Sequence, residues 1–413
     1  MGELTKLRRG GVEWTVESRH ADALCSGLFG GIHQLESLPA AALVKRSLAR
    51  VVHRARLDDG SVVIVKAYLV RGWRDRVKGA LLGPKPSIEW EASRRLLGMG
   101  IPASHAIAVG RPGPRRRGLE GYLVVEVLPD VTSIGDWLRT QRSAAAQNAA
   151  EGDRQFLHEL AAFVRRLHDS GVSHHDLHRG NILVRTAPPS PEERFLVIDL
   201  HRMRVGRAPS AGHRAEAIAQ LLHGLSGDLG LGLRDAVAAF LEAYEAAGRP
   251  LRTPRIGVDS ILARIERRSA KRLGSRARRC QKESTQFTVE VVDGWRIYHR
   301  RDHAASSIIT LWQEHRRARA VAAPSAEAPV ITHHTLGGGG GEVEVREHPA
   351  PRLFARLFAP LRRLPGVCDY AAAHRRWLET GGGPVAIAGA ECLRGPDRGT
   401  SFAVLWRRRE PET

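Results

Sequence analysis

The alternation of apolar and polar residues predicts a strand-rich first part of the chain. Residues 47–57 and 61–70 have the pattern of two strands, joined by the Asp-Gly hairpin turn of LDDG. The second of them, SVVIVKAYLV, is a run of β-branched residues that contains Lys66. Residues 87–98 have a helical pattern, and GYLVVEVLPD at 121–130 predicts a further buried strand. These elements indicate a small lobe built mainly from strands.

A helical pattern dominates the next part of the chain. Residues 153–170 place an apolar stripe along one helix, with suitable capping residues at both ends. The short strands NILVR and RFLVIDL follow, and helical patterns fill roughly 213–250 and 257–281. A linker-like segment, 144–152, precedes this helical part. We therefore expect an α+β fold in two lobes, with an N-terminal extension, a small lobe, a large lobe and a C-terminal α+β region at residues 1–42, 43–130, 131–280 and 281–413.

Composition places the chain among globular proteins with polyanionic partners. Its 413 residues are 42% hydrophobic and 26% charged, which is typical of a chain that buries a core. Lysine and arginine number 64 against 44 aspartates and glutamates, which gives a net charge of +20. Nearly all of the positive charge is arginine. Such a charge favours nucleic acid, anionic lipid headgroups or a phosphorylated substrate, and does not decide among them.

The spacing of the cysteines indicates a reducing compartment, and the apolar runs are too short for a membrane span. The four cysteines are far apart and form no CxxC pair, which argues against a structural zinc site and a disulfide framework. The N-terminal residues MGELTKLRRGGVEW have no hydrophobic signal core, and no apolar stretch reaches the roughly 18–20 residues of a membrane span. We expect a cytoplasmic protein, soluble or at most peripheral to a membrane.

The segment GVSHHDLHRGNILVR, residues 171–185, concentrates residues that carry chemistry just ahead of a strand. A metal site built from its histidines is one interpretation, but adjacent residues rarely share a metal, and no cysteine or second histidine pair is spaced to complete the site. The alternative is a loop that acts on a phosphate. Asp176 and Asn181 have the D-x-x-x-x-N spacing of a kinase catalytic loop, and Asp199 ends an apolar strand eighteen residues later. Asp176 can take a hydroxyl proton, and Asn181 and Asp199 can hold a metal ion.

Lys66 and Glu89 lie upstream, in the order that phosphate transfer requires. Lysine is rare here, with seven residues in the chain, and Lys66 follows VVIV on a predicted strand. Its ammonium group can neutralise phosphates, held in place by an ion pair with a carboxylate of the next helix. Glu89 is the first candidate for that carboxylate, and Glu91 is a rival that faces elsewhere on the helix.

These motifs resemble those of the lipopolysaccharide core kinases, a family of small-molecule kinases with a bilobal, protein-kinase-like fold. The resemblance covers roughly residues 43–250 and is carried by HHDLHRGNILV, FLVIDL, VVIVKAY and EWEASRRLLGMGIP. It implies ATP and Mg²⁺ as cofactors, and Kdo or heptose of the lipopolysaccharide inner core as the acceptor. The expected partner is then an anionic glycolipid, a lipid A-core precursor, met at the inner face of the cytoplasmic membrane.

The same resemblance implies a role for each candidate residue. The roles are the catalytic base (Asp176), the Mg²⁺ ligands (Asn181, Asp199), the ATP-phosphate pair (Lys66, Glu89) and the backbone that lines the adenine pocket (Glu126 to Leu128).

The chain also departs from the usual kinase pattern. No GxGxxG motif precedes Lys66, so residues 45–60 would have to cover the phosphates with fewer glycines. The metal-binding motif reads Asp-Leu-His at 199–201, without the usual Phe-Gly, and His175 stands where protein kinases carry arginine. That histidine argues against regulation by activation-loop phosphorylation. For His178 we expect a structural role.

Residues 331–406 echo residues 51–126, which indicates a degenerate second copy of the small lobe. Lys66 then corresponds to Arg346 and Glu89 to Asp369, and an extra hairpin, STQFTVEVVDGWRIYHRR, precedes the copy. Because arginine does not readily replace a compact ammonium group, we expect no productive ATP binding there. Chance similarity among segments rich in alanine, arginine and glycine is the alternative. The run LGGGGGE is expected to be a flexible hairpin tip.

Four functions remain open at this point. A lipopolysaccharide core kinase accounts for the most residues. An atypical kinase for another small-molecule or protein hydroxyl has the same catalytic set, and a pseudokinase or scaffold is favoured by the missing glycine-rich loop. Nucleic-acid binding rests on charge alone, without aromatic platforms or a recognisable module, so no nucleic-acid partner is expected.

Overall fold

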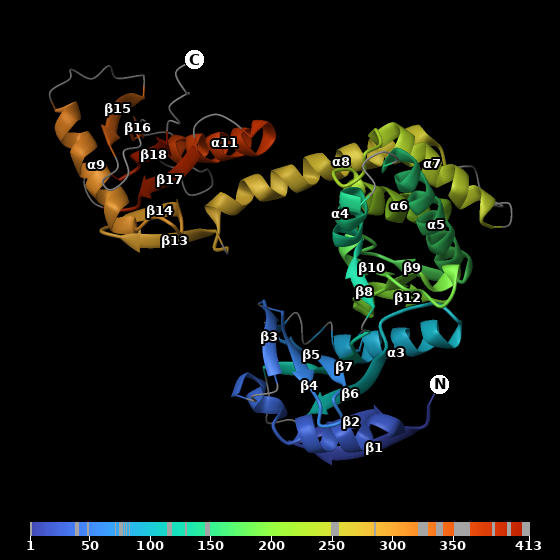
Figure 1. Cartoon of the computed structure of the whole chain (residues 1–413). Helices are drawn as coiled ribbons and strands as arrows, with labels where there is room; N and C mark the ends of the chain where they lie inside the picture. The colour runs from blue at the N-terminus through green and yellow to red at the C-terminus, as the bar shows by residue number, and fades with distance from the viewer. Residues whose placement is uncertain are drawn as a thin grey trace. The chain divides into compact units, whose positions relative to one another are not determined.

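The computed structural model describes residues 2–37, 41–47, 49–70, 83–113, 118–128, 130–144, 149–248, 256–284, 286–320, 329–335, 342–350, 364–381, 385–394 and 398–406, with positions 72, 73, 77, 79 and 81. Contacts divide the chain into two compact units, Met1–Glu266 and Arg267–Thr413 (Figure 1). None of the helices in these ranges has the length and apolar composition needed to cross a bilayer.

A seven-stranded antiparallel sheet, in the order β1-β2-β6-β7-β5-β4-β3, forms the small lobe of the first unit. Its strands are β1 (Leu4–Arg9), β2 (Val12–Glu17), β3 (Ala41–Arg46), β4 (Arg50–Arg56), β5 (Val62–Leu69), β6 (Ala106–Pro112) and β7 (Leu119–Glu126). β4 and β5 are the two predicted strands, paired as a hairpin. The β1–β2 hairpin, from the predicted N-terminal extension, pairs with β6 and so belongs to the same sheet.

Helical segments pack on both faces of this sheet. The predicted helix at 87–98 is α3 (Lys85–Gly98), and its Trp90 packs with Tyr68 and Leu123 on one face. On the other face Trp14 stacks on Phe29, with ring centroids 3.9 Å apart. Phe29 belongs to a run of short helical turns between Ser18 and Ser37. These are η1 (Ser18–His20), α1 (Ala21–Leu24), η2 (Cys25–Phe29) and η3 (Ile32–Ser37).

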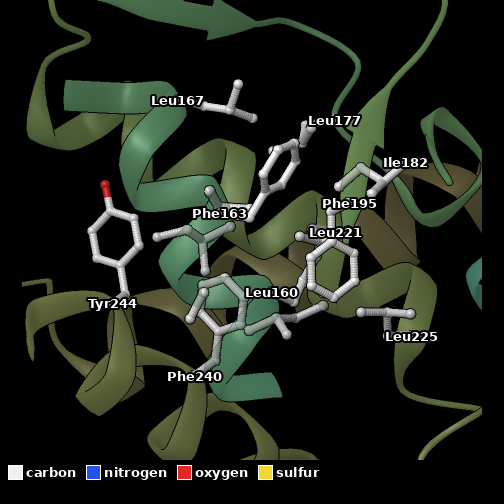
Figure 2. Close-up of a cluster of buried hydrophobic side chains, with 14 of the residues drawn as sticks. Leu160, Phe163, Leu167, Leu177, Ile182, Phe195, Leu221, Leu225, Phe240 and Tyr244 are labelled. Atoms are coloured by element: carbon white, nitrogen blue, oxygen red, sulfur yellow. The ribbon is translucent and has the colours of Figure 1, made fainter. Parts of the chain in front are cut away.

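The large lobe of the first unit is mainly helical. Its helices are α4 (Ile134–Ala144), α5 (Ala149–Asp169), α6 (Ala211–Leu225), α7 (Leu233–Ala246) and α8 (Val258–Ala277), the last of which crosses the boundary between the units. The predicted apolar stripe of α5 lies in the core of this lobe. Figure 2 shows Leu160 and Phe163 of α5 beside Leu221, Phe240 and Tyr244.

The structure corrects one prediction in this lobe and refines another. The described residues of the linker-like segment, 144 and 149–152, are helical, because SAAAQNAAEG is rich in alanine, the best helix former, and they belong to α4 and α5. Residues 145–148 lie outside the described ranges. The helical stretch predicted at 213–250 is two helices, since the three glycines of SGDLGLG separate α6 from α7.

Two small antiparallel sheets fix the chemically rich segment 171–185. One joins β8 (Val131–Ser133), β10 (Ile182–Arg185) and β11 (Phe195–Val197), and the other joins β9 (Val172–His174) to β12 (Met203–Val205). The 3-10 turns between these strands are η4 (Arg179–Asn181), η5 (Pro191–Glu193) and η6 (Leu200–Arg202). The candidate loop therefore begins and ends on paired strands.

The second unit is built on a six-stranded antiparallel sheet, in the order β13-β14-β17-β18-β16-β15. After η7 (Arg278–Gln281), its elements are β13 (Phe287–Val292), β14 (Trp295–Arg300), α9 (Ala305–Arg319), β15 (Val330–Thr335), β16 (Glu342–His348), α11 (Pro365–Thr380), β17 (Val385–Cys392) and β18 (Ser401–Trp406). β13 and β14 are the predicted extra hairpin. The predicted flexible tip LGGGGGE lies almost wholly outside the described residues.

The two sheets have equivalent strand orders. The strands β13, β14, β15, β16, β17 and β18 of the second sheet occupy the places of β1, β2, β4, β5, β6 and β7, respectively, in the first. The registers also agree. Lys66 lies opposite Leu123 and Arg346 opposite Ala403, so residue numbers shifted by 280 reproduce this pairing. Both sheets carry an irregularity at the equivalent place, between Ala106 and Ala108 in the first sheet and at 386–388 in the second.

Candidate active site

Lys66 and Glu89 form a buried ion pair. Lys66 lies in β5, paired on both sides within the sheet, and Glu89 lies on the face of α3 that packs against this sheet. Lys66 Nζ is 2.6 Å from Glu89 Oε1, and the side chains are 13% and 1% exposed. The Tyr68 hydroxyl also donates to the Glu89 carboxylate. Glu91, the rival, is exposed to solvent, so the structure pairs the lysine with Glu89.

Asp199 lies between β11 and η6. Its backbone has a left-handed conformation, with φ 61° and ψ 52°. Such a conformation costs about 1–3 kcal/mol in a residue other than glycine and clusters at functional sites. Arg50 donates to both carboxylate oxygens, at 2.8 and 3.2 Å, and His201 Nδ1 donates at 2.8 Å. Burial opposes ionisation, but the hydrogen bonds from His201 and Arg50 outweigh it and hold the pKa of Asp199 well below its usual range.

Asp176 presents its carboxylate between two side chains of the large lobe. Gln220 of α6 donates to one oxygen at 2.7 Å, and Arg202 donates to the other at 3.1 Å. The amide nitrogen of Asn181 donates to the Asp176 backbone carbonyl at 2.9 Å, which turns the Asn181 side chain toward the loop. Asp176 and Asn181 are therefore held in one fixed loop, as their spacing predicts.

Hydrogen bonds tie this loop to the strand that leads to Asp199. His174 Nε2 donates to the Ile198 carbonyl at 3.3 Å, and its Nδ1 accepts from the Asp176 backbone N–H at 3.1 Å. Burial lowers the pKa of His174, which fits this neutral tautomer. The Ile198 N–H also donates to the Asn181 carbonyl at 2.9 Å. The base candidate and both metal-ligand candidates thus belong to one hydrogen-bonded assembly.

The histidines of the loop do not form a metal site. His174 is occupied by backbone groups, and His178 Nδ1 accepts from the Gly180 N–H at 3.0 Å, which is the structural role expected for it. Within the described ranges, one group of side chains brings three potential metal ligands together. Glu89, Asp199 and His201 place ligand atoms within 4.8 Å of one another.

Glu126 and Leu128 lie where β7 leaves the small lobe. The backbone N–H groups of Glu126 and Val127 donate to the carbonyls of His105 and Val62, so the sheet already uses them. The Glu126 side chain accepts from His105 Nδ1 at 2.7 Å, and His105 Nε2 also reaches Glu17 at 2.9 Å. Hydrogen bonds to Glu126 and Glu17 raise the pKa of His105.

Several side chains of the site have no motif that would reveal them in the sequence. Arg50 stands 149 residues before its partner Asp199, and Gln220 stands 44 residues after Asp176. His201 stands where the usual motif has glycine. The motif therefore does not predict that this position would donate a hydrogen bond to Asp199. Chain folding, not spacing, brings these groups together.

Comparisons with known proteins identify relatives of this part of the chain. Residues 46–244 match the model of the lipopolysaccharide kinase (Kdo/WaaP) family. The lipopolysaccharide core heptose(I) kinase WaaP of Pseudomonas aeruginosa is 29% identical over 219 residues, 52% of this chain and 80% of that protein. A protein of the same name from Escherichia coli is 26% identical over 186 residues, 44% of this chain and 68% of that protein.

A solved structure described as WaaP in complex with acyl carrier protein is also similar. It has 26% sequence identity and a TM-score of 0.41, over 58% of this chain and 92% of that one.

The two-lobed α+β fold, the Lys66–Glu89 pair and the matched relatives define the first unit as a kinase with a protein-kinase-like fold. The resemblance to the lipopolysaccharide core kinases is confirmed, and residues 46–244 are the part of the chain that carries it.

Proposed function

We propose that this protein transfers the terminal phosphate of ATP to a sugar hydroxyl of the lipopolysaccharide inner core, on Kdo or heptose. The observation that carries the proposal is the buried Lys66–Glu89 pair beside Asp199, together with the loop that holds Asp176 and Asn181. An ion pair with a purely structural role does not require Asp176, Asn181 and Asp199 nearby, whereas phosphate transfer uses all of these residues.

Lys66 would neutralise the ATP phosphates, because its ammonium group is fixed by Glu89 and remains partly exposed. The adenine base would lie against residues 126–128. Since the N–H groups of Glu126 and Val127 are used within the sheet, contacts to the base would come from the carbonyls of this segment and from Leu128.

Asp176 would accept the proton of the acceptor hydroxyl. Gln220 and Arg202 fix its carboxylate, so the oxygen that receives the proton is already oriented. Arg202 also keeps a positive charge near the place where negative charge passes from the hydroxyl to the phosphate.

The donor set fits a magnesium ion. Asp199 supplies carboxylate oxygens, and the Asn181 amide, whose nitrogen is committed to Asp176, has its oxygen left for a cation. Mg²⁺ prefers such oxygen ligands, so Asp199 and Asn181 would hold it. A bound Mg²⁺ would offset the charge of the phosphates.

Charge and the resemblance to the lipopolysaccharide kinases support a proposal for the acceptor and its location. The net charge of +20 suits an anionic glycolipid, and basic surfaces are attracted to anionic headgroups. We therefore place the protein in the cytoplasm, with peripheral contact to the inner face of the cytoplasmic membrane, where a lipid A-core precursor is met.

The test is phosphate transfer by the purified full chain. Mg²⁺, ATP and a lipid A precursor that carries Kdo or heptose would be incubated with wild-type protein and with Asp176→Asn, and the product mass measured. We expect one added phosphate with wild type and none with the variant. ATP binding without transfer would reject this acceptor class, and absence of Mg²⁺-ATP binding would reject the enzyme.

We also propose that the second sheet is a degenerate copy of the small lobe that binds no nucleotide. The common strand order and register support the copy. Arg346, in the place of Lys66, donates to Glu344 on its own strand instead of to α11. Asp369, in the place of Glu89, instead accepts from His348 at 2.8 Å.

A further inference from the structure

In the turn between β3 and β4, the described backbone donors of Ser47, Ala49 and Arg50 are already used. In kinases a glycine-rich loop upstream of the lysine covers the phosphates with its backbone, and the β3–β4 turn lies one strand before the strand of Lys66. Here Ser47 Oγ accepts from the N–H groups of Ala49 and Arg50, at 3.3 and 3.2 Å. The Ser47 N–H donates to the Arg50 carbonyl at 2.9 Å. At these three positions the turn is closed on itself.

A guanidinium group stands at the end of this turn. Arg50 is the first residue of β4, and its side chain is 22% exposed. The guanidinium extends to the large lobe and donates to both carboxylate oxygens of Asp199. Asp199 in turn lies with Glu89 in the cluster of potential metal ligands. Two cations, Lys66 and Arg50, therefore face two carboxylates in one small volume.

Binding of Mg²⁺ and ATP would change this charge balance. A metal ion held by Asp199 repels the guanidinium that occupies the same carboxylate, and the triphosphate that accompanies the metal offers new acceptors nearby. The planar fork of an arginine matches phosphate oxygens as well as it matches a carboxylate.

We propose that Arg50 is the phosphate-binding residue that replaces the missing glycine-rich loop, held by Asp199 until nucleotide and metal arrive. On binding, Asp199 exchanges the guanidinium for the metal, and Arg50 exchanges the carboxylate for the phosphates of the nucleotide. No bond is made or broken in this step. The proposal rests on the ATP site proposed above and adds to it the group that recognises the phosphates.

Equilibrium binding of two ligands to the full chain tests this role. Mg²⁺-ATP carries the phosphates, whereas adenosine occupies the base pocket without them. We expect Arg50→Ala to weaken Mg²⁺-ATP binding about 10- to 100-fold, the loss typical of a charge-assisted contact, and to leave adenosine binding unchanged. Arg50→Lys should recover part of the affinity, since it keeps the charge and loses the fork.

Arg54→Ala is the matched control, because Arg54 lies on the same strand with its side chain in solvent. It should bind both ligands as wild type does. The proposal is overturned if Arg50→Ala binds Mg²⁺-ATP as tightly as wild type, or more tightly, or if both ligands weaken equally. Failure of the wild type to bind either ligand would instead reject the nucleotide site itself. Thermal unfolding of each variant separates loss of binding from loss of the fold.

Discussion

The two sheets of this chain share strand order and nearly all of their register, yet β5 and β16, which occupy equivalent places, make different contacts with the neighbouring helices α3 and α11. In the first sheet Lys66 reaches across to Glu89 on α3, and Tyr68 donates to the same carboxylate. In the second sheet Arg346 donates to Glu344 of its own strand, and His348 bonds to Asp369 of α11. The same sheet thus forms without a lysine–glutamate pair. The pair is not what holds this architecture together, so its presence in the first sheet points to chemistry.

A second comparison shows what the architecture does require. α3 approaches β7 where Pro86 lies against Gly121, and a Cβ at Gly121 would come within 2.7 Å of the proline ring. At the equivalent place in the second sheet the small residue is on the helix, where a Cβ at Gly366 would lie 2.5 Å from the backbone of Phe402. Both units need one glycine where helix and strand touch, and either element can supply it.

The largest expected difference between the sheets is in catalysis. Lys66→Met should lower turnover about 10²–10³-fold, because it removes a fixed cation from the phosphates. Arg346→Met should leave turnover unchanged, since Arg346 bonds within its own strand. Steady-state rates for both variants measure this, with thermal unfolding as the check on folding. Equal losses in the two variants would contradict the division of roles.

A difference in packing should appear at position 110. A Cβ on Gly110 would lie 2.6 Å from the ring of Trp14, so Gly110→Ala should destabilise the first unit by about 1–3 kcal/mol through overpacking. The second sheet already has Ala390 at this place, and Ala390→Gly should cost only about 0.5–1 kcal/mol. Denaturant unfolding of each variant gives both values. A harmless Gly110→Ala would show that Trp14 is free to move.

A smaller effect is expected from the tyrosine that supports Glu89. Tyr68→Phe removes one donor to that carboxylate and keeps the ring in its packing, so turnover should fall about 10-fold. His348→Phe, the equivalent change in the second sheet, removes the bond to Asp369 and should leave turnover unaltered. If Tyr68→Phe turned over at the wild-type rate, Lys66 alone would suffice to position Glu89.

The smallest effect should be the dependence of stability on pH that His105 of the first unit contributes. The pKa of His105 is raised by Glu126 and Glu17, so the stabilisation it gives is fully present below the ordinary pKa, near 6.5, and is lost as pH rises through the raised value. His105→Gln should therefore lower Tm by about 2–4 °C at pH 6, the shift given by roughly 1 kcal/mol, and by less at pH 8. Val385 has the equivalent place in the second sheet and cannot titrate. An equal loss of Tm at both pH values would argue against the charged pair.

Much of the site could be predicted from order along the chain. The spacing of Asp176 and Asn181 is local, so it survives in the sequence as a motif, and the strand before Asp199 is apolar enough to be recognised. Glu89 could not be separated from Glu91 with certainty, because that choice depends on which face of α3 meets the sheet.

Contacts between distant segments could not be predicted. Nothing in the sequence around Arg50 signals Asp199, and nothing in residues 1–42 signals that Val12–Glu17 would pair with β6. The polar network around Asp176 is equally non-local, since Gln220 belongs to a helix whose apolar pattern alone was visible. Such contacts are set by the tertiary fold, and a local pattern carries no record of them.

The agreement in register has a consequence for how the chain assembles. Each sheet ends in a two-stranded hairpin, β1–β2 or β13–β14, added at the same edge in the same alignment, so either hairpin has the backbone bonds to complete either sheet. Trp14 distinguishes them. It lies opposite Gly110 in its own sheet, but on the other sheet it would meet the methyl group of Ala390, where Ile297 belongs. Trp14 therefore fits opposite Gly110 better than opposite Ala390, which disfavours an exchange of the two hairpins.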